Sequence, residues 1–236
     1  MENFSFYFSL IAFLIHIIGG IYFFVWWIIS GRKHLPLLYF AYGLGVFLLF
    51  KIPNILANFG VTIVQKDFYP FFFISLLLYF SAYIVLIKGV ILLSGFSYRK
   101  LLSHFFKAWF GVAVFYFALS FFGGYELTYA PVWMGHILFY IPAQFFLLNE
   151  LWWASRRGAD PQSISGFGVI CAAMGTIGAF AASILYIVVQ TMSSSRVFWY
   201  FSAVSSWSIS IVQIISGLFL FVGLYSMARS HLRSLS

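Results

Sequence analysis

Seven long apolar stretches, separated by short polar segments, restrict how this chain can fold more than any other feature of its sequence. They cover about residues 6–29, 37–59, 70–93, 105–122, 131–153, 164–191 and 198–227. Each is long enough for an α-helix to cross a bilayer, which takes at least about 17 residues. Charged residues make up only 8% of the chain, against about 25% in soluble domains. The sequence therefore predicts an all-α integral membrane protein, a bundle of seven transmembrane helices in a single domain over residues 1–236.

The basic residues between these stretches predict the orientation in the membrane. With the N-terminus outside, nine of the 13 lysines and arginines face the cytoplasm: Arg32, Lys33, Arg99, Lys100, Lys107, Arg156, Arg157, Arg229 and Arg233. The opposite side keeps Lys66 and Arg196. Because cytoplasmic loops carry an excess of lysine and arginine, we expect the N-terminus outside and the C-terminus inside. These short clusters, despite a net charge of +8, favour a multi-pass protein of the plasma (cytoplasmic) membrane over a nucleic-acid-binding surface.

The second apolar stretch contains charged and helix-breaking residues. Lys51, Pro53 and Asn54 stand close together there, and each is costly or disruptive in lipid. At 1.5 Å per residue, Lys51 lies about 21 Å from the cytoplasmic start of its helix, in the outer half of the bilayer. Its ammonium could hold an anion, pair with Glu126 or Asp67 of the outer loops, titrate with an altered pKa, or extend to the headgroups. We expect Pro53 to kink the helix and to free a carbonyl that Asn54 could satisfy.

The fifth stretch carries the most polar helix. His136, Tyr140, Gln144 and Glu150 fall within about 120° of one another around its axis. Four hydrogen-bonding groups on one side favour an orientation toward the bundle interior, where they either line a ligand pocket or only stabilise packing. His136 lies about 8 Å below the outer end of the helix, at a depth comparable to that of Lys51. The predicted ligand site therefore consists of Lys51, Asn54, His136, Tyr140 and Gln144.

Two further contacts between helices are predicted. Lys88 and Glu150 both lie about 27 Å inward from the start of their stretches, so we expect a structural ion pair near the cytoplasmic surface. In the sixth stretch, small residues share one face, which predicts close packing against a neighbouring helix within the chain or in an oligomer. The residues of this face are Cys171, Gly175, Gly178 and Ala182.

No motif in the sequence indicates an enzyme. It has no His-Glu metal motif, serine-hydrolase elbow, Walker loop or dinucleotide fingerprint. Cys171 is the only cysteine, which excludes an intramolecular disulfide and a thiolate metal cluster. His16 and His136 differ in depth by about 8 Å, so a bis-histidine haem is not expected. No catalytic residue and no metal ligand is therefore predicted, and the cofactor is left open.

Three functions suit such a bundle. The preferred one is a receptor-like or sensory protein that binds a small or lipophilic ligand in an outer-half cavity and signals to a partner. The second is a small transporter or channel that uses the same polar cavity together with Ser206, Ser210 and Gln213. The third is a non-catalytic subunit of a larger membrane complex, favoured by short loops and by the small-residue face of the sixth stretch. The expected partners are the lipid bilayer, a ligand and another membrane protein or a second copy of the chain.

Overall fold

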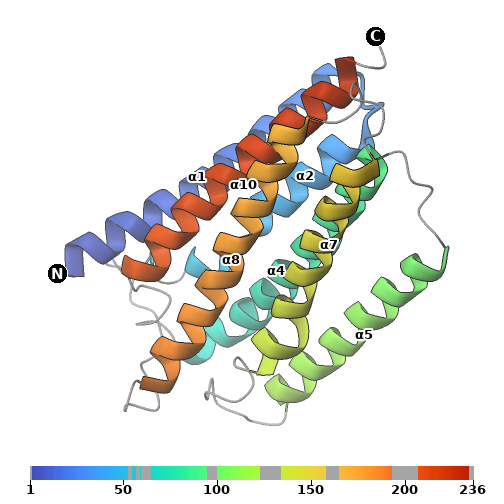
Figure 1. Cartoon of the computed structure of the whole chain (residues 1–236). Helices are drawn as coiled ribbons and strands as arrows, with labels where there is room; N and C mark the ends of the chain where they lie inside the picture. The colour runs from blue at the N-terminus through green and yellow to red at the C-terminus, as the bar shows by residue number, and fades with distance from the viewer. Residues whose placement is uncertain are drawn as a thin grey trace.

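The structure is a computed structural model, and in the part of the chain that it describes every regular element is helical. The described residues are 2–52, 55–56, 59, 65–94, 100–122, 134–157, 165–192 and 207–233. In chain order the elements are α1 (Glu2–Ile29), α2 (Leu35–Val46), the 3-10 helix η1 (Leu49–Lys51), α4 (Gln65–Leu93), α5 (Lys100–Phe122), the π-helix η2 (His136–Tyr140), α7 (Ile141–Arg157), α8 (Gly166–Met192) and α10 (Trp207–Arg233) (Figure 1). The predicted all-α class is thereby confirmed.

Five of the described helices are long and apolar enough to cross a membrane. Their apolar segments are Phe6–Ile29 of α1, Phe73–Leu93 of α4, Leu102–Phe122 of α5, Gly166–Val189 of α8 and Trp207–Arg233 of α10. The mean hydropathy of these segments lies between 1.7 and 2.3. They overlap the first, third, fourth, sixth and seventh predicted stretches. The seventh helix continues to Arg233, beyond the predicted end near residue 227, and residues 198–206 of that stretch lie outside the described residues. The second and fifth stretches also form helices, but their backbones are not regular.

The helix of the second stretch ends earlier than predicted. Helix α2 stops at Val46, and Leu48 leaves the helical region with φ −119° and ψ 23°. The chain resumes as the short 3-10 helix η1, in which the Lys51 N–H donates to the Leu48 carbonyl at 3.0 Å. The last turn of α2 contains Gly43 and Gly45, and glycine is a poor helix former that favours such an early end. The break therefore precedes Pro53, which lies outside the described residues together with Asn54.

The helix of the fifth stretch contains one wide turn. Residues 134–157 are helical throughout, about 36 Å at the helical rise, and His136–Tyr140 form a π-helical turn within them. The N–H of Ile141 donates to the carbonyl of His136, five residues earlier. Such turns are rare inside α-helices and occur frequently at functional sites. Here the wide turn carries two of the predicted site residues, His136 and Tyr140.

The helices pack in a definite order. Helix α1 contacts α2 and α10, α10 contacts α8, α8 contacts α7, and α4 contacts α2, α5 and α7. Figure 1 shows α1, α10 and α8 side by side, with α5 at the opposite edge of the bundle. Helix α5 also reaches α7 through aromatic rings, such as Phe106 against Phe146 at 5.9 Å between centroids. The space between α1, α4, α7, α8 and α10 therefore forms the interior of the bundle.

Small residues allow the closest of these contacts, between α8 and α10. A Cβ atom at Gly175 would lie 2.5 Å from the Leu220 nitrogen, and one at Gly178 would lie 3.0 Å from the Ser216 Cβ. The predicted small-residue face of α8 thus lies against α10 of the same chain at these two glycines. Cys171 and Ala182, the other two residues of that face, are both buried. This close contact fixes the position of α10, which carries Ser210 and Gln213 into the interior.

Candidate functional site

Lys51 is completely enclosed by the bundle. None of its side chain is exposed, and its Nζ donates a hydrogen bond to Ser210 Oγ of α10 at 3.1 Å. Ser210 Oγ also forms a hydrogen bond with Ser9 Oγ of α1 at 3.0 Å. An ammonium held in this way does not extend to the headgroups. The alternative partners Glu126 and Asp67 have side chains that the structure does not describe.

His16 lies beside this lysine and completes what we call the lysine cluster: Ser9, His16, Lys51 and Ser210. The His16 ring is buried and close enough to Lys51 for the two groups to interact electrostatically. Its Nδ1 lies 2.8 Å from the Ala12 carbonyl, so Nδ1 carries the proton and Nε2 presents a lone pair. Among the described residues, that Nε2 has no hydrogen-bond partner. Gly217 makes room for the ring, because a Cβ there would lie 2.5 Å from His16 Cε1.

Gln144 of α7 is the centre of a second buried group, the glutamine cluster: Tyr79, Tyr83, Gln144 and Ser183. Its Nε2 donates to Tyr83 OH at 2.8 Å and to Ser183 Oγ at 3.0 Å, and the Ala179 carbonyl lies at 3.4 Å. Tyr83 OH in turn shares a hydrogen bond with Tyr79 OH at 3.0 Å. One side chain of α7 therefore links α4 to α8 inside the bundle.

The side-chain carbonyl oxygen of Gln144 accepts no hydrogen bond from the described residues. The Ala179 carbonyl can only accept, so its contact with Nε2 favours this amide orientation over the reverse. This leaves Gln144 Oε1 buried without a donor among the described residues, and Gln213 Oε1 of α10 is in the same state. His16 Nε2 is likewise a buried acceptor without a donor in the described part of the chain. A guest that satisfies them must supply N–H or O–H groups.

His136 and Tyr140 lie next to the glutamine cluster. Tyr140 OH donates to the Leu76 carbonyl at 3.2 Å. The His136 ring packs against Tyr140 and Tyr186 at centroid distances of 4.7 and 4.6 Å. Its Nδ1 is buried without a hydrogen-bond partner in the described part of the chain. The side of the π-turn that faces the interior is therefore aromatic, with one ring nitrogen still available.

The predicted site residues fall into two groups instead of one. His136, Tyr140 and Gln144 lie together between α4, α7 and α8, whereas Lys51 lies between α1, α2 and α10. Among the described residues, no hydrogen bond joins Lys51 to the other three. Asn54, the fifth predicted residue, lies outside the described residues.

One aromatic ring connects the two clusters. Phe47, which directly follows α2, stacks on His16 at 5.2 Å with an interplanar angle of 6°. The same ring meets Tyr79 at 4.8 Å and Tyr83 at 5.0 Å, edge to face. The lysine and glutamine clusters are therefore the two ends of one interior site, with Phe47 between them.

Several residues of this site were not predicted from the sequence. Tyr79 and Tyr83 stand four positions apart on α4, the same spacing as Tyr140 and Gln144 on α7. That spacing places polar groups on one helical face and could have signalled the contact. Ser9 offered no such signal, because a serine in a lipid-embedded helix usually bonds to its own backbone.

The predicted ion pair remains a prediction. Lys88 and Glu150 lie on α4 and α7, which contact each other, and both side chains are partly buried.

As for metals, the described residues contain no group of three or more His, Cys, Asp or Glu side chains that could hold an ion. The buried thiol of Cys171 is free.

Comparisons of the chain with protein-family models, with curated proteins and with solved structures found no match. The class of the protein therefore follows from its own geometry. Five of the described helices are long and apolar enough to cross a membrane, and this is compatible with a multi-pass helical membrane protein.

Proposed function

We propose that this chain is a receptor-like or sensory protein of the plasma membrane that crosses it seven times, with the N-terminus outside. In this proposal a small or lipophilic ligand binds in the interior between the lysine and glutamine clusters, and the bound state is passed to a partner protein. The observation that carries the proposal is that His16 Nε2 and Gln144 Oε1 are buried without partners among the described residues, close to a fully enclosed lysine.

The energetic cost of these groups supports a binding role. Placing a lysine in the membrane interior costs about 3 kcal/mol, and a buried polar atom without a partner costs about 1–3 kcal/mol. Ser210 Oγ offsets only part of the first cost through one hydrogen bond. A guest that accepts from Lys51 and donates to Gln144 Oε1 would reduce both costs at once.

The side chains around this region define the chemistry of that guest. Phe47, Tyr79 and Tyr140 present ring surfaces, which favour an apolar body. Lys51 at one end favours an anionic or carbonyl group, and Gln144 at the other end requires a hydroxyl or amine. We therefore expect a small amphiphile with polar atoms at both ends. A hydroxylated fatty acid is a suitable probe.

The binding experiment uses thermal unfolding of the detergent-solubilised full chain with hydroxydecanoate, decanoate and decane as probes. Hydroxydecanoate should raise the unfolding temperature most, and decane should not raise it. The effect should disappear in Lys51→Met and in His136→Ala. Two exposed residues of α5 provide matched controls: Lys107→Met and His104→Ala should retain it. Unchanged stabilisation in both interior variants would refute the proposal.

A transporter or channel is the second candidate, and one observation favours it. Polar side chains follow each other along the inner face of α10, where Ser210, Gln213 and Ser216 are all buried. Flux of the same probe into proteoliposomes distinguishes the two, since a sensor binds without transport.

The third candidate, a scaffold subunit, loses one of its arguments. Gly175 and Gly178 already pack against α10 within the chain, so this part of the small-residue face is not free for another protein.

The proposed orientation has its own test. In a Cys171→Ala background, a cysteine in place of Glu2 should react with a membrane-impermeant maleimide added to intact cells. A cysteine in place of Ser236 should react only after the membrane is permeabilised. Both results are expected because the basic residues predict an outer N-terminus and an inner C-terminus. Labelling of both residues in intact cells would contradict an odd number of crossings.

A further inference from the structure

We propose that an anionic phospholipid occupies a groove between α7 and α8, with one acyl chain along the groove and its phosphate at Arg156. This site is separate from the interior clusters. Its assignment to the cytoplasmic leaflet rests on the proposed orientation, whereas the binding itself does not.

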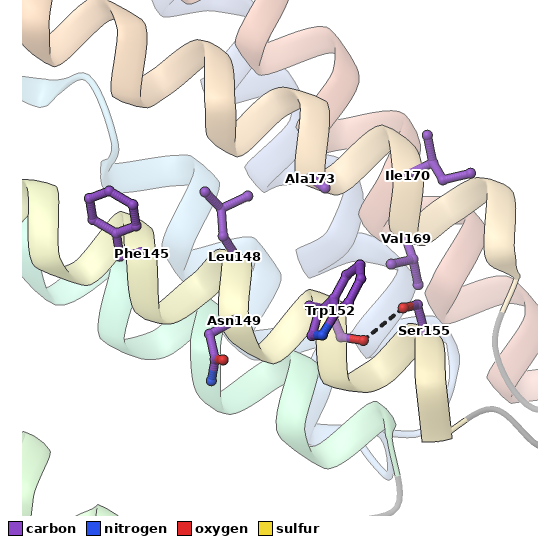
Figure 2. Close-up of a pocket in the computed structure, with 8 residues that line it drawn as sticks. All are labelled: Phe145, Leu148, Asn149, Trp152, Ser155, Val169, Ile170 and Ala173. Carbon is purple, nitrogen blue, oxygen red and sulfur yellow. Dashed lines mark hydrogen bonds between the residues drawn. The ribbon is translucent and has the colours of Figure 1, made fainter.

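The groove is a surface feature of the two helices and has a volume of about 510 Å³. Helix α7 contributes Phe145, Leu148, Asn149, Trp152 and Ser155 to its lining (Figure 2). Helix α8 contributes Val169, Ile170 and Ala173. The larger side chains are open to the surroundings, since Trp152 is 55% exposed and Ile170 is 62% exposed. On a helix in a membrane, such an open apolar groove faces acyl chains.

The length of the groove fits one leaflet. Phe145 and Ser155 stand ten positions apart on α7, which is about 15 Å along the helix. The hydrocarbon core of a bilayer is about 30 Å thick, so one leaflet contributes about half of it. A groove of this length, ending near the last turn of α7, therefore fits an acyl chain that runs from the interface to the midplane.

The charge at the end of the groove selects the headgroup. The Arg156 guanidinium lies over the ring of Trp152, with 4.4 Å between Cζ and the ring centroid. Because Trp152 lines the groove, this contact holds a positive charge beside its end. Basic sites between helices at the cytoplasmic side of a membrane bind anionic headgroups. Glu150, the one carboxylate in the sequence of α7, is not part of the lining.

Two polar groups complete the arrangement. Asn149 is exposed in the groove about 10 Å along the helix from Arg156, so its amide N–H groups face the glycerol ester region of a lipid whose phosphate lies at Arg156. Ser155 donates its hydroxyl to the Trp152 carbonyl at 2.7 Å, as Figure 2 shows, so its oxygen is left as an acceptor. The cationic group thus matches a phosphate, the amide matches the glycerol ester, and the apolar lining matches the acyl chain.

The experiment is native mass spectrometry of the full chain in detergent, with dioleoyl-phosphatidylglycerol and dioleoyl-phosphatidylcholine as probes. The wild type should bind the anionic lipid about fivefold more tightly, the effect expected from one arginine near a membrane surface. Arg156→Gln should remove this preference. Arg229→Gln is the matched control, because Arg229 is also exposed and also lies over an aromatic ring, that of Tyr225. It should leave the preference unchanged.

A second pair of variants tests the groove itself. Ala173→Phe fills it and should weaken the binding of both lipids, whereas Met174→Phe, at the next position and not part of the lining, should not. Equal affinity of the wild type for the two lipids would overturn the proposal, and so would a preference that persists in Arg156→Gln. Unchanged binding in Ala173→Phe would place the lipid elsewhere and overturn it as well. None of these outcomes depends on Lys51, so failure here and failure of the ligand proposal are distinguishable.

Discussion

Replacement of Lys51 by methionine is expected to make the protein more stable, by about 2 kcal/mol. Methionine has nearly the same length as lysine and is apolar. Exchanging a buried charge for an apolar group of similar volume is often neutral or stabilising by a few kcal/mol. The insertion cost of a lysine at the centre of a membrane helix, about 3 kcal/mol, is removed. The hydrogen bond to Ser210 is lost, and interhelical hydrogen bonds in membranes contribute about 0.6 kcal/mol.

The local contacts favour this outcome. Without the ammonium, Ser210 Oγ keeps its hydrogen bond with Ser9 Oγ. The substitution therefore leaves this buried oxygen of α10 with a hydrogen-bond partner. The free energy of unfolding, from denaturation of the reconstituted protein by sodium dodecyl sulfate, is the measurement. Lys107→Met, at an exposed position of α5, is the control and should change it by less than about 0.5 kcal/mol. If Lys51→Met destabilised the protein, the lysine would be structural, and its cost would no longer support a binding role.

The second large effect is expected at Gly175, where leucine should destabilise the protein by about 3 kcal/mol or more. A Cβ at this position already lies 2.5 Å from the Leu220 nitrogen and 2.8 Å from the Ser216 carbonyl oxygen. Both are backbone atoms, so the added side chain must push α8 away from α10. Forcing extra atoms into a packed interface costs about 1–3 kcal/mol, and more where the backbone has to move.

A graded series makes this prediction specific to the contact. Gly178→Ala should destabilise less than Gly175→Ala, because the Cβ there would meet the Ser216 Cβ at 3.0 Å and the nearest backbone atom, Ser216 Cα, only at 3.3 Å. Gly111→Ala, on α5, should instead stabilise by up to about 1 kcal/mol, since a Cβ there meets no atom of the described chain within 4 Å and alanine is the better helix former. Thermal unfolding in detergent measures all three. Equal effects at Gly175 and Gly111 would show that helix propensity, and not the α8–α10 contact, controls stability.

The all-α class and the approximate residue ranges of the long helices were predictable from the sequence, because both depend on local hydropathy. The third apolar stretch, about 70–93, corresponds to the apolar segment Phe73–Leu93 of α4, and the sixth, about 164–191, corresponds to α8. A long run of apolar residues has few alternatives to a helix in a membrane, since every backbone group must be satisfied within the segment. The number of crossings and their direction remain predictions.

The two irregular turns were not predictable in the same way. The end of α2 at Val46 precedes Pro53, whereas the π-turn His136–Tyr140 stands just before Pro142, which has no N–H for the Leu138 carbonyl and crowds it. A proline indicates a disturbed helix, but the local sequence does not specify whether the backbone kinks, ends or forms a wide turn. The consequence for the site was direct. The predicted depths of Lys51 and His136, and the predicted inward face of the fifth stretch, assume a regular helix. Both irregular turns lie close to these residues.

The division of the site into two clusters also depends on tertiary contacts. Hydropathy indicates that Gln144 faces the interior, but it does not indicate that α4 presents Tyr83 and α8 presents Ser183 to it. Similarly, the sequence placed Lys51 in a membrane helix without identifying Ser210 of α10 as its partner. The choice of neighbouring helices and their register depends on side-chain packing between helices, and the sequence of one helix alone does not determine it.

The position of Phe47 has a consequence for how such a bundle could transmit a signal. The ring is buried and is shared by His16 of α1 and by Tyr79 and Tyr83 of α4. Its backbone lies where α2 ends, and two residues beyond Val46 the chain leaves the helical region at Leu48. Any displacement of this one side chain would change its contacts with both clusters at the same time. In the proposed sensor, a ligand that moves this one ring would therefore link the two clusters.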